Sequence, residues 1–399
     1  MMNLGGKQMN YRNNNGQKDL SILGYGCMRF PKKAGSIDMI ETEKQVMYAI
    51  ENGVNYFDTA YIYPGSEAAL GEILYKNNVR EKVKIATKLP HYLVKKTEDL
   101  EKYFQEELKR LQTDYVDYYL MHMLPDVQVW KRLIGLGVLE WIEEKKSLGQ
   151  IKYIGFSYHG NTQNFLEVLN VYDWEFCQIQ YNYMDEHSQA GVKGLKAAAE
   201  KNIPVIIMEP LRGGLLVNGL PKKAEKAFEE STRHITPVEW ALRWLWRQEE
   251  VSVILSGMST MAMIEENINI ASNVEVNEWS SSEEAFISEI RVILNEKTKV
   301  PCTACSYCMP CPFGVDIPGA FRCYNVSHVD GYFVGLKEYA MSTTLRSKQT
   351  MASLCTACGA CEKHCPQNIK IIKELKKVKR RFESPVYKLA SKYIKKRYS

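Results

Sequence analysis

Short apolar runs rich in β-branched and aromatic residues recur eight times between residues 22 and 255, with amphipathic segments of helical period between them. A chain that alternates strands with helices favours a parallel sheet, because each helix returns the chain to the start of the next strand. Eight such units over about 260 residues predict a (β/α)8 TIM barrel. An open, doubly wound sheet is the alternative, but no G-x-G-x-x-G segment follows the first run. The predicted strands are residues 22–26, 54–57, 83–87, 116–121, 153–156, 176–180, 205–208 and 251–255.

Four ionisable side chains stand where consecutive predicted strands end. Asp58 and Tyr63 follow the second strand, whereas Lys88 ends the third and His122 ends the fourth. The active site of such a barrel lies at the C-terminal ends of its strands, so we expect these side chains to converge. A nearby ammonium favours the phenolate form of a tyrosine and eases proton donation, which Lys88 can do for Tyr63. Asp58 can hold Lys88 in place and His122 can hydrogen-bond a substrate carbonyl. The set suits protonation of an alkoxide as a hydride reaches the carbonyl carbon.

Eight of the eleven cysteines stand near the C-terminus in two short runs, each closed by a Cys-Pro pair. In runs of this kind, three close cysteines bind one [4Fe-4S] cluster, and the fourth, just before the proline, binds the other. Two runs therefore predict two clusters and one-electron transfer. The metal ligands that we assign are Cys302, Cys305, Cys308 and Cys365 for one cluster, and Cys355, Cys358, Cys361 and Cys311 for the other.

Structural zinc and a disulfide scaffold are the alternative interpretations of these cysteines. Zinc needs only four ligands, in pairs set apart by a loop, which two quadruple runs fit poorly. A disulfide scaffold fits worse in a large chain without a secretory signal. The first run departs from the bacterial pattern, because two residues rather than three precede Cys311. The spacer 312–354 shows helical stretches and little β pattern, so a small, mainly α-helical ferredoxin-like domain is expected after the barrel.

The segments around the four ionisable residues resemble a known family. Residues 55–63 (NYFDTAYIY), 86–90 (ATKLP) and 120–122 (LMH) are similar to the signature, lysine and histidine segments of the aldo-keto reductases, and the resemblance covers residues 20–275. It implies an oxidoreductase whose catalytic tetrad is Asp58, Tyr63, Lys88 and His122. With its cysteine runs, the whole chain resembles the subgroup that carries a C-terminal [4Fe-4S] extension.

The same resemblance implies a NAD(P)H cofactor held at the ends of the remaining strands. Residues 23–28 are similar to the first-strand segment that flanks the nicotinamide, and residues 211–215 to a pyrophosphate loop. The implied cofactor-binding residues are Gly26, Cys27, Met28, Ser157, Gln178, Met208, Leu211, Gly213, Gly257, Ser259 and Asn267.

Several positions depart from the family pattern. Tyr158 stands where the family commonly has an asparagine that holds the carboxamide, and Met208 where many members have an aromatic ring. NADPH-binding members have Lys and Arg at the positions of Gly257 and Met263, and without cations a 2′-phosphate gains little. The resemblance therefore does not extend to a preference for NADPH. NADH, weaker nicotinamide binding, and a flavin whose phosphate uses the same loop remain alternatives.

The composition is that of an ordinary globular protein, with 45% apolar and 25% charged residues among 399. No apolar run reaches membrane-spanning length and the N-terminus lacks a signal-peptide core, so a cytoplasmic protein without a transmembrane segment is expected. Thiolate-bound clusters favour a reducing, anaerobic setting. We expect the barrel in residues 1–295, the two-cluster domain in 296–370 and a basic tail in 371–399.

The C-terminal segment 370–399 is strongly basic, with twelve Lys or Arg against two Glu. It also carries an apolar stripe of helical period, formed by Ile371, Ile372, Leu375, Val378 and Phe382. The favoured interpretation is a docked helix with a solvated basic face, and the alternative is a landing site for an acidic electron carrier or an anionic surface. Nothing beyond these charges supports binding of nucleic acid.

Two functions compete. The first is an oxidoreductase that reduces a carbonyl or a related unsaturated small molecule at the tetrad, coupled to the clusters and to a ferredoxin or flavoprotein electron partner. The second is an electron-transfer or regulatory subunit of a larger redox complex, with a vestigial barrel site. A nicotinamide exchanges two electrons and a cluster exchanges one, so a flavin in the barrel mouth or in a partner protein is expected as the converter.

Overall fold

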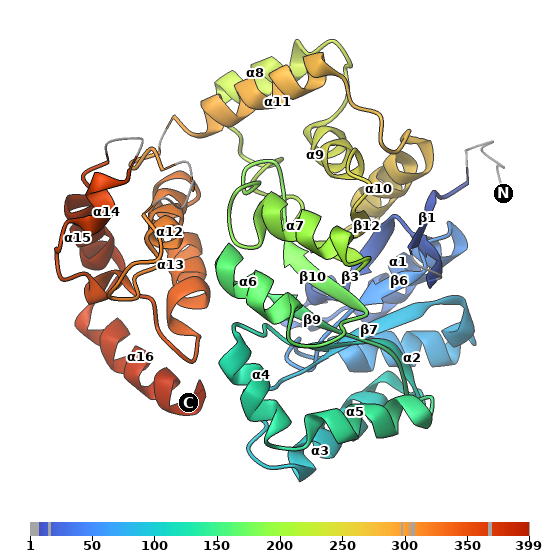
Figure 1. Cartoon of the computed structure of the whole chain (residues 1–399). Helices are drawn as coiled ribbons and strands as arrows, with labels where there is room; N and C mark the ends of the chain where they lie inside the picture. The colour runs from blue at the N-terminus through green and yellow to red at the C-terminus, as the bar shows by residue number, and fades with distance from the viewer. Residues whose placement is uncertain are drawn as a thin grey trace.

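The computed structural model describes residues 8–14, 17–296, 298–302, 304, 308–365 and 369–398. Its larger part is a closed barrel of parallel strands with helices around it (Figure 1). The strands follow one another around the barrel in chain order, which confirms the predicted (β/α)8 fold and excludes the open sheet. The barrel strands are β3 (Leu23–Gly26), β6 (Tyr56–Asp58), β7 (Lys84–Leu89), β8 (Val116–Met121), β9 (Ile151–Tyr158), β10 (Phe176–Gln180), β11 (Val205–Met208) and β12 (Val251–Ser256).

Helices follow the strands and form the outer layer. Side chains cap several of them: the Asp126 carboxylate accepts hydrogen bonds from the backbone N–H groups of Gln128 and Val129, and Ser280 forms a capping box with Glu283. The helices of this part are α1 (Met39–Glu51), α2 (Ser66–Lys76), α3 (Glu98–Leu111), α4 (Val127–Ile134), α5 (Val138–Ser147), α6 (Thr162–Leu169), α7 (Gly191–Glu200), α8 (Lys222–Glu229), α9 (Pro237–Trp246), α10 (Met261–Asn273) and α11 (Ser281–Leu294). Short antiparallel pairs are formed by β1 (Tyr11–Asn14) with β2 (Gln17–Ser21), and by β4 (Lys32–Lys33) with β5 (Ser36–Ile37).

Side chains alternate along the strands between the barrel interior and the helix layer. In β8, Tyr118 and Leu120 belong to the apolar cluster that fills the barrel, whereas Tyr119 and Met121 belong to the cluster between strands and helices. Successive side chains of a strand point to opposite faces, and here the barrel interior covers one face and the helices cover the other. The barrel is therefore a packed core rather than a pore, and only its ends are free to form a site.

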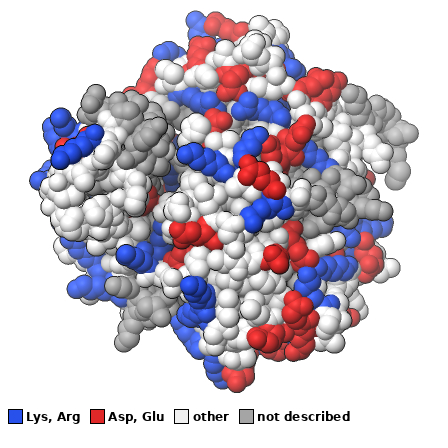
Figure 2. All heavy atoms as spheres, in the orientation of Figure 1, with Lys and Arg blue, Asp and Glu red and all other residues white. Residues whose placement is uncertain are grey.

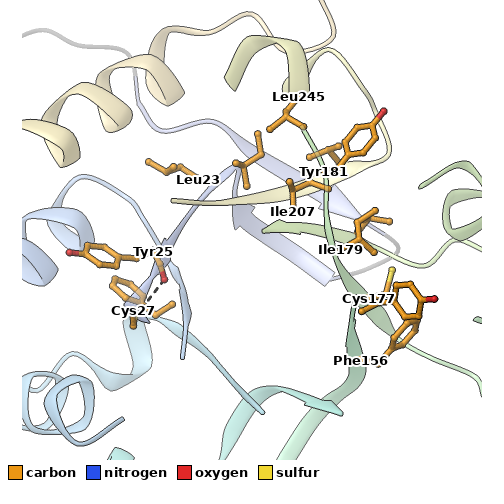
Figure 3. Packing of buried hydrophobic residues seen from close by; sticks show 14 of the residues in the cluster. Leu23, Tyr25, Cys27, Phe156, Cys177, Ile179, Tyr181, Ile207 and Leu245 are labelled. Atoms are coloured by element: carbon orange, nitrogen blue, oxygen red, sulfur yellow. Dashed lines mark hydrogen bonds between the residues drawn. The ribbon is translucent and has the colours of Figure 1, made fainter. Parts of the chain in front are cut away.

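Figure 3 shows part of the outer layer, in which Ile179 of β10 and Ile207 of β11 lie near Leu245 of α9. Two cysteines outside the runs, Cys27 and Cys177, are fully buried in the same layer. They act there as small apolar side chains.

The second domain is mainly helical, as the sequence predicts. Its helices enclose a separate apolar cluster that includes Phe321, Cys323 and Tyr339. The barrel cluster ends at Leu294 and this cluster begins at Val300, while the division of the chain at residues 295 and 370 stays a prediction. The elements are α12 (Ile317–Val329), α13 (Tyr332–Tyr339), a π-helical turn (Ala340–Thr344), a 3-10 turn (Ala352–Leu354), α14 (Ala360–Lys363), α15 (Ile371–Phe382) and α16 (Pro385–Tyr398).

Helix α15 is docked on this domain by its apolar stripe. Ile371, Leu375, Val378 and Phe382 are buried in the second cluster, whereas most of the lysines of the helix are exposed. On the face seen in Figure 2, Lys and Arg predominate over Asp and Glu on the second domain, while the two signs are interspersed over the barrel. The docked-helix interpretation of the stripe is therefore confirmed for α15.

The second domain packs against loops at the C-terminal ends of the barrel strands (Figure 1). After β8, Asp126 accepts a hydrogen bond from the Ser347 hydroxyl at 2.5 Å. At the end of β9, the buried Arg346 lies so close to Gly160 that any larger residue there would clash with its guanidinium. These contacts place the helical domain over the mouth of the barrel. No helix among the described residues is both long enough and apolar enough to cross a membrane.

Candidate active site

The four ionisable side chains predicted to converge do so at the mouth of the barrel. Asp58 ends β6 and Lys88 lies in β7, and because these strands are neighbours their ends are side by side. The Lys88 Nζ donates to Asp58 Oδ1 at 2.7 Å and to the Thr59 carbonyl at 2.6 Å. It lies 5.2 Å from the ring centroid of Tyr63, and the Tyr63 ring stands edge-on to His122 with 6.2 Å between centroids.

Burial and charge set the protonation of these groups. Burial raises the pKa of Tyr63 above its ordinary value and outweighs the opposing effect of the Lys88 ammonium. Burial lowers the pKa of Lys88, but the charges of Asp58 and Tyr63 more than offset this, so the net pKa of Lys88 is raised. Lys88 is therefore a cation at neutral pH and Tyr63 a protonated phenol. The Lys88 ammonium lowers the pKa of Tyr63, as the sequence argument expected, but burial is the larger effect.

His122 is kept neutral. Burial, and then the charge of Lys88, hold the pKa of His122 well below its ordinary value. Its Nδ1 is buried and has no hydrogen-bond partner among the described residues. A neutral imidazole can donate one hydrogen bond to a substrate oxygen without adding charge to the site.

Two of the implied cofactor contacts already have protein partners. The Ser157 hydroxyl accepts a hydrogen bond from the backbone N–H of Met123 at 2.7 Å. Gln178 donates through Nε2 to Asp58 Oδ2 at 2.9 Å, so it supports the tetrad directly. Tyr158, where the family commonly has asparagine, donates to the Asn161 carbonyl at 2.6 Å. Each of these three side chains therefore forms a hydrogen bond within the protein.

The remaining implied contacts line the strand ends from β3 to β12. Cys27 is fully buried whereas Met28 is 57% exposed, so only the latter presents its side chain to the surface. Asn267 donates to the Ser256 hydroxyl at 2.8 Å, and the Ser259 hydroxyl contacts the sulfur of Met263 at 3.8 Å. The other members lie at the end of β3 (Gly26), at the end of β11 and in the loop after it (Met208, Leu211, Gly213), and in the loop after β12 (Gly257).

Arg29 is a candidate binding residue that the sequence argument missed. Its Nη1 donates to the Gly213 carbonyl at 3.2 Å, and its side chain covers Gly257 so closely that a Cβ there would lie 3.2 Å from the Arg29 Cδ. Gly213 and Gly214 adopt φ values of 70° and 95°, which favour glycine. A glycine turn with an arginine across it fits a phosphate-bearing group. Its sequence signal was weak, because Arg29 is a single cation just after the first strand segment.

The described cysteines of the two runs are partly buried against the apolar cluster of the second domain, except for the exposed Cys358. Burial, followed by the negative charge of Cys355 and then of Cys311, raises the pKa of Cys361. Cys311 of the first run therefore lies near cysteines of the second, as an exchange of fourth ligands requires. Cys305 lies outside the described residues.

The two runs supply eight cysteine thiolates, which is the number and type of ligand that two [4Fe-4S] clusters need. No described cysteine forms a disulfide. Within the described ranges, no three His, Cys, Asp or Glu side chains converge closely enough to hold a single metal ion. The four thiolates of a cluster bind four different iron atoms, so they stand farther apart than the ligands of one ion.

Residues 22–284 match the model of the Aldo/keto reductase family. The chain belongs to the aldo/keto reductase family. Residues 301–370 match the model of a 4Fe-4S dicluster domain, so this aldo/keto reductase carries such a domain after its barrel.

Curated relatives match the barrel of this aldo/keto reductase. L-galactose dehydrogenase of Arabidopsis thaliana is 27% identical over 305 residues, which are 69% of this chain and 91% of that protein. The aldo-keto reductase yakc (NADP(+)) of Schizosaccharomyces pombe is 22% identical over 293 residues, 63% of this chain and 84% of that protein.

Among solved structures, the holo form of aldo-keto reductase AKR11C1 from Bacillus halodurans has a TM-score of 0.59 at 23% identity and covers 71% of this chain and 96% of its own. An aldo-keto reductase of Klebsiella pneumoniae in complex with NADPH has a TM-score of 0.57 at 21% identity, covering 71% and 95%. At these identities the likeness establishes the fold of this aldo/keto reductase.

Proposed function

We propose that this chain reduces a carbonyl, or a related unsaturated group, of a small molecule at Tyr63, and that the reaction is coupled to one-electron transfer through two [4Fe-4S] clusters. One observation carries the barrel half: the buried Lys88–Asp58 ion pair, with 2.7 Å between Nζ and Oδ1, beside the Tyr63 ring. The cluster half is supported by the dicluster-domain match and by the docking of that domain over the barrel mouth.

Reduction of a carbonyl adds a hydride to its carbon and a proton to its oxygen. A nicotinamide or flavin supplies the hydride when bound, and a [4Fe-4S] cluster exchanges single electrons. Tyr63 holds the proton on its phenol until charge develops on the substrate oxygen, and the Lys88 ammonium stabilises the phenolate that remains. His122 can donate a hydrogen bond to the same oxygen and orient it.

The cofactor that we propose is NADH or a flavin nucleotide, without preference for a 2′-phosphate. Gly257 and Met263 offer no cation to a 2′-phosphate, whereas Arg29 spans the loops that would hold the other phosphates. Because hydride chemistry moves two electrons and a cluster moves one, a flavin in the mouth or in a flavoprotein partner would act as the converter. A ferredoxin partner would exchange single electrons with the clusters. We place the reaction in a reducing cytoplasm.

The test starts with protein purified without oxygen, whose iron, sulfide and flavin contents and visible spectrum are measured before and after NADH is added. Two clusters and a bound flavin, with cluster reduction by NADH, support the coupling. Only cluster absorbance, with clusters that stay oxidised, rules out an internal flavin.

Turnover is then compared for Tyr63→Phe and for Tyr61→Phe on a broad panel of aldehydes and ketones. Tyr61 is a matched control, because its hydroxyl donates to Glu106 at 2.9 Å rather than joining the tetrad. The proposal requires Tyr63→Phe to lose about 10²-fold or more in kcat and Tyr61→Phe to keep its rate.

An electron-transfer or regulatory subunit with a vestigial barrel site is the second candidate. This candidate is favoured by the residues at the positions where the family binds the nicotinamide carboxamide. Hydrogen bonds join Ser157, Tyr158 and Gln178 to other protein groups there. Unchanged turnover in Tyr63→Phe, together with normal cluster reduction by a protein partner, would select this candidate.

A further inference from the structure

A cavity of about 350 Å³ lies between the barrel mouth and the second domain. Its floor comes from the loops after β9, β10 and β11, and its roof from α12, α13 and the π-helical turn. The volume equals about a dozen water molecules at ~30 Å³ each. It stands at the lower end of the range for small-molecule sites, roughly 300–1,000 Å³. The cavity therefore suits a single small molecule.

The floor contains a buried guanidinium that lacks hydrogen bonds. Arg212 is 8% exposed, and its nearest carboxylate oxygens belong to Asp185 at 3.6 Å and Asp330 at 3.4 Å. Neither contact is a hydrogen bond, and the Arg212 Nε has no hydrogen-bond partner among the described residues. A buried donor without an acceptor is unfavourable, and a ligand oxygen in the cavity would relieve this. A planar guanidinium suits a carboxylate in particular, because two parallel N–H groups match its two oxygens.

A chain of hydrogen bonds fixes an acceptor on the same floor. Gln180 donates to Asp185 at 3.1 Å, and Gln189 donates to Gln180 at 2.8 Å. The Gln189 oxygen therefore faces the Nδ1 of His159, 3.2 Å away, and accepts a hydrogen bond from the Nδ1–H group. This tautomer leaves the His159 Nε2 as an acceptor. Gln189 adopts a left-handed backbone with φ of 56°, which an ordinary side chain adopts only when its surroundings hold it there.

Further cations reach the cavity from both domains. Arg29, which also faces the proposed cofactor loop at Gly213, stands on the barrel side and Lys337, on α13, at the roof, while Glu209 is the acidic group of the floor. Arg322 of α12 is paired with Glu338 at 2.5 Å and still keeps one nitrogen, Nη2, without a hydrogen bond to a described residue. The lining has four cationic and two acidic side chains, and Asp185 and Asp330 behind it also face Arg212 and Arg322. Lys337 and Arg29 form no ion pair with a described carboxylate, so they favour a ligand with a negative end.

The cavity adjoins the tetrad. Gln178 and Gln180 lie two residues apart in β10, so their side chains point to the same side of the strand. Gln178 donates to Asp58 Oδ2 at 2.9 Å, and Gln180 lines the cavity. A molecule in the cavity can therefore extend one end to the tetrad.

We propose that the interdomain cavity binds the substrate, and that the substrate is a small hydroxylated oxo acid whose carboxylate pairs with Arg212 and whose hydroxyl donates to His159 Nε2. This assignment rests on the proposed reduction at Tyr63 and adds the substrate class to it. The roof makes the second domain part of the specificity site. Lys337 belongs to α13 of the second domain, so this domain contributes a cation to the binding of the substrate.

The test is direct binding, measured by calorimetry on the intact, cluster-loaded chain without nucleotide. The probes are D-gluconate, which has a carboxylate and hydroxyls, D-glucose, which lacks the carboxylate, and hexanoate, which lacks the hydroxyls. Gluconate is expected to bind at least about tenfold more tightly than either, the loss expected for one hydrogen bond to a charged group. Arg212→Lys, His159→Phe and Lys337→Met should each weaken gluconate binding by a similar factor. Lys348→Met, an exposed lysine of the second domain outside the lining, should not.

Three results would overturn the inference: equal or no binding of the three probes, gluconate affinity that survives all three cavity substitutions, or competition between NADH and gluconate, which would give the cavity to the cofactor. Lys337 is exposed, so its variant tests the roof even if the buried variants fail to fold. Binding is independent of turnover. If Tyr63→Phe keeps its rate while gluconate binding follows the expected pattern, the proposed reaction fails and the binding site stands.

Discussion

The carboxylate of Asp185 in the barrel pairs with the guanidinium of Arg322 in the second domain, with 3.5 Å between Oδ1 and Nη1. The same carboxylate lies 3.6 Å from Arg212 of the barrel, so it serves cations of both domains. The two cations outweigh burial and hold the pKa of Asp185 below its ordinary value. Breaking such a pair leaves an uncompensated charge where water is scarce. The pair therefore ties the helical domain to the barrel mouth.

Asp185→Asn should loosen this attachment. Loss of one partner of a buried pair costs about 3–5 kcal/mol. We expect faster hydrogen exchange in α12 and α13 of the intact chain, with the barrel helices α2 and α3 unaffected. Glu230→Gln is the control, because the Lys226–Glu230 pair is exposed and is worth about 0–1 kcal/mol. Unchanged protection of α12 would contradict the role given to Asp185.

Asp58→Asn should shift the pH dependence of turnover. Without the Asp58 charge, burial dominates at Lys88 and lowers its pKa, so the ammonium is lost at a lower pH. The alkaline limb of kcat/KM against pH should move to lower pH. Asp117→Asn removes another buried, ion-paired carboxylate, at the opposite end of β8. It should reduce stability without moving that limb.

The barrel should lose stability as the pH falls from 7.5 to 5.5. Burial lowers the pKa of His91 from 6.5 to about 4, so in this range the unfolded chain binds more protons than the folded one. Stability contributed by the neutral ring is present above pH 6.5 and declines toward pH 4, by about 1 kcal/mol between 7.5 and 5.5. All seven tryptophans lie between residues 130 and 279, so urea unfolding followed by their fluorescence reports on the barrel.

His91→Asn should flatten that dependence by about the same amount, whatever it does to stability at pH 7.5. A variant with the wild-type slope would show that His91 does not titrate as its burial implies.

The exchange of fourth ligands between the cysteine runs predicts which double variants lose one cluster and which lose two. Cys311→Ser and Cys358→Ser should each remove the same cluster, so the double variant should lose no more iron than either single one. Cys302→Ser with Cys358→Ser should lose both clusters. Iron and sulfide contents measure the difference, and Cys323→Ser, buried outside the runs, serves as the control. If the Cys311/Cys358 double variant lost both clusters, the ligands would not be exchanged.

The barrel and its tetrad were accessible from sequence because their signals are local. The predicted strands coincide with the observed ones to within a few residues, and for β8, β10 and β11 the limits are identical. The largest shifts at the start of a strand are two residues, at β9, predicted from residue 153 and observed from Ile151, and at β6, predicted from residue 54 and observed from Tyr56. Val54 is buried at 1% exposure in the connection that leads into the strand, and apolar character cannot distinguish a buried connection from a paired strand.

The balance of forces at Tyr63 was not accessible in the same way. The sequence places Lys88 near the phenol, but how strongly the phenol is desolvated depends on how closely the side chains around it pack. The same holds for Ser157 and Gln178, whose hydrogen bonds to Met123 and Asp58 could not be inferred from their positions at strand ends.

The sequence by itself determined the eight-unit barrel, the four ionisable groups at successive strand ends and the two cysteine runs, because each is a pattern of period or spacing within a short stretch of chain. Only the tertiary structure decided that Arg29 crosses from the first strand to the loops at Gly213 and Gly257, and that a helical domain encloses a cavity above the mouth. Arg212 and Arg322 meet one carboxylate from positions 110 residues apart in the chain, and packing, which follows no local period, brings them together.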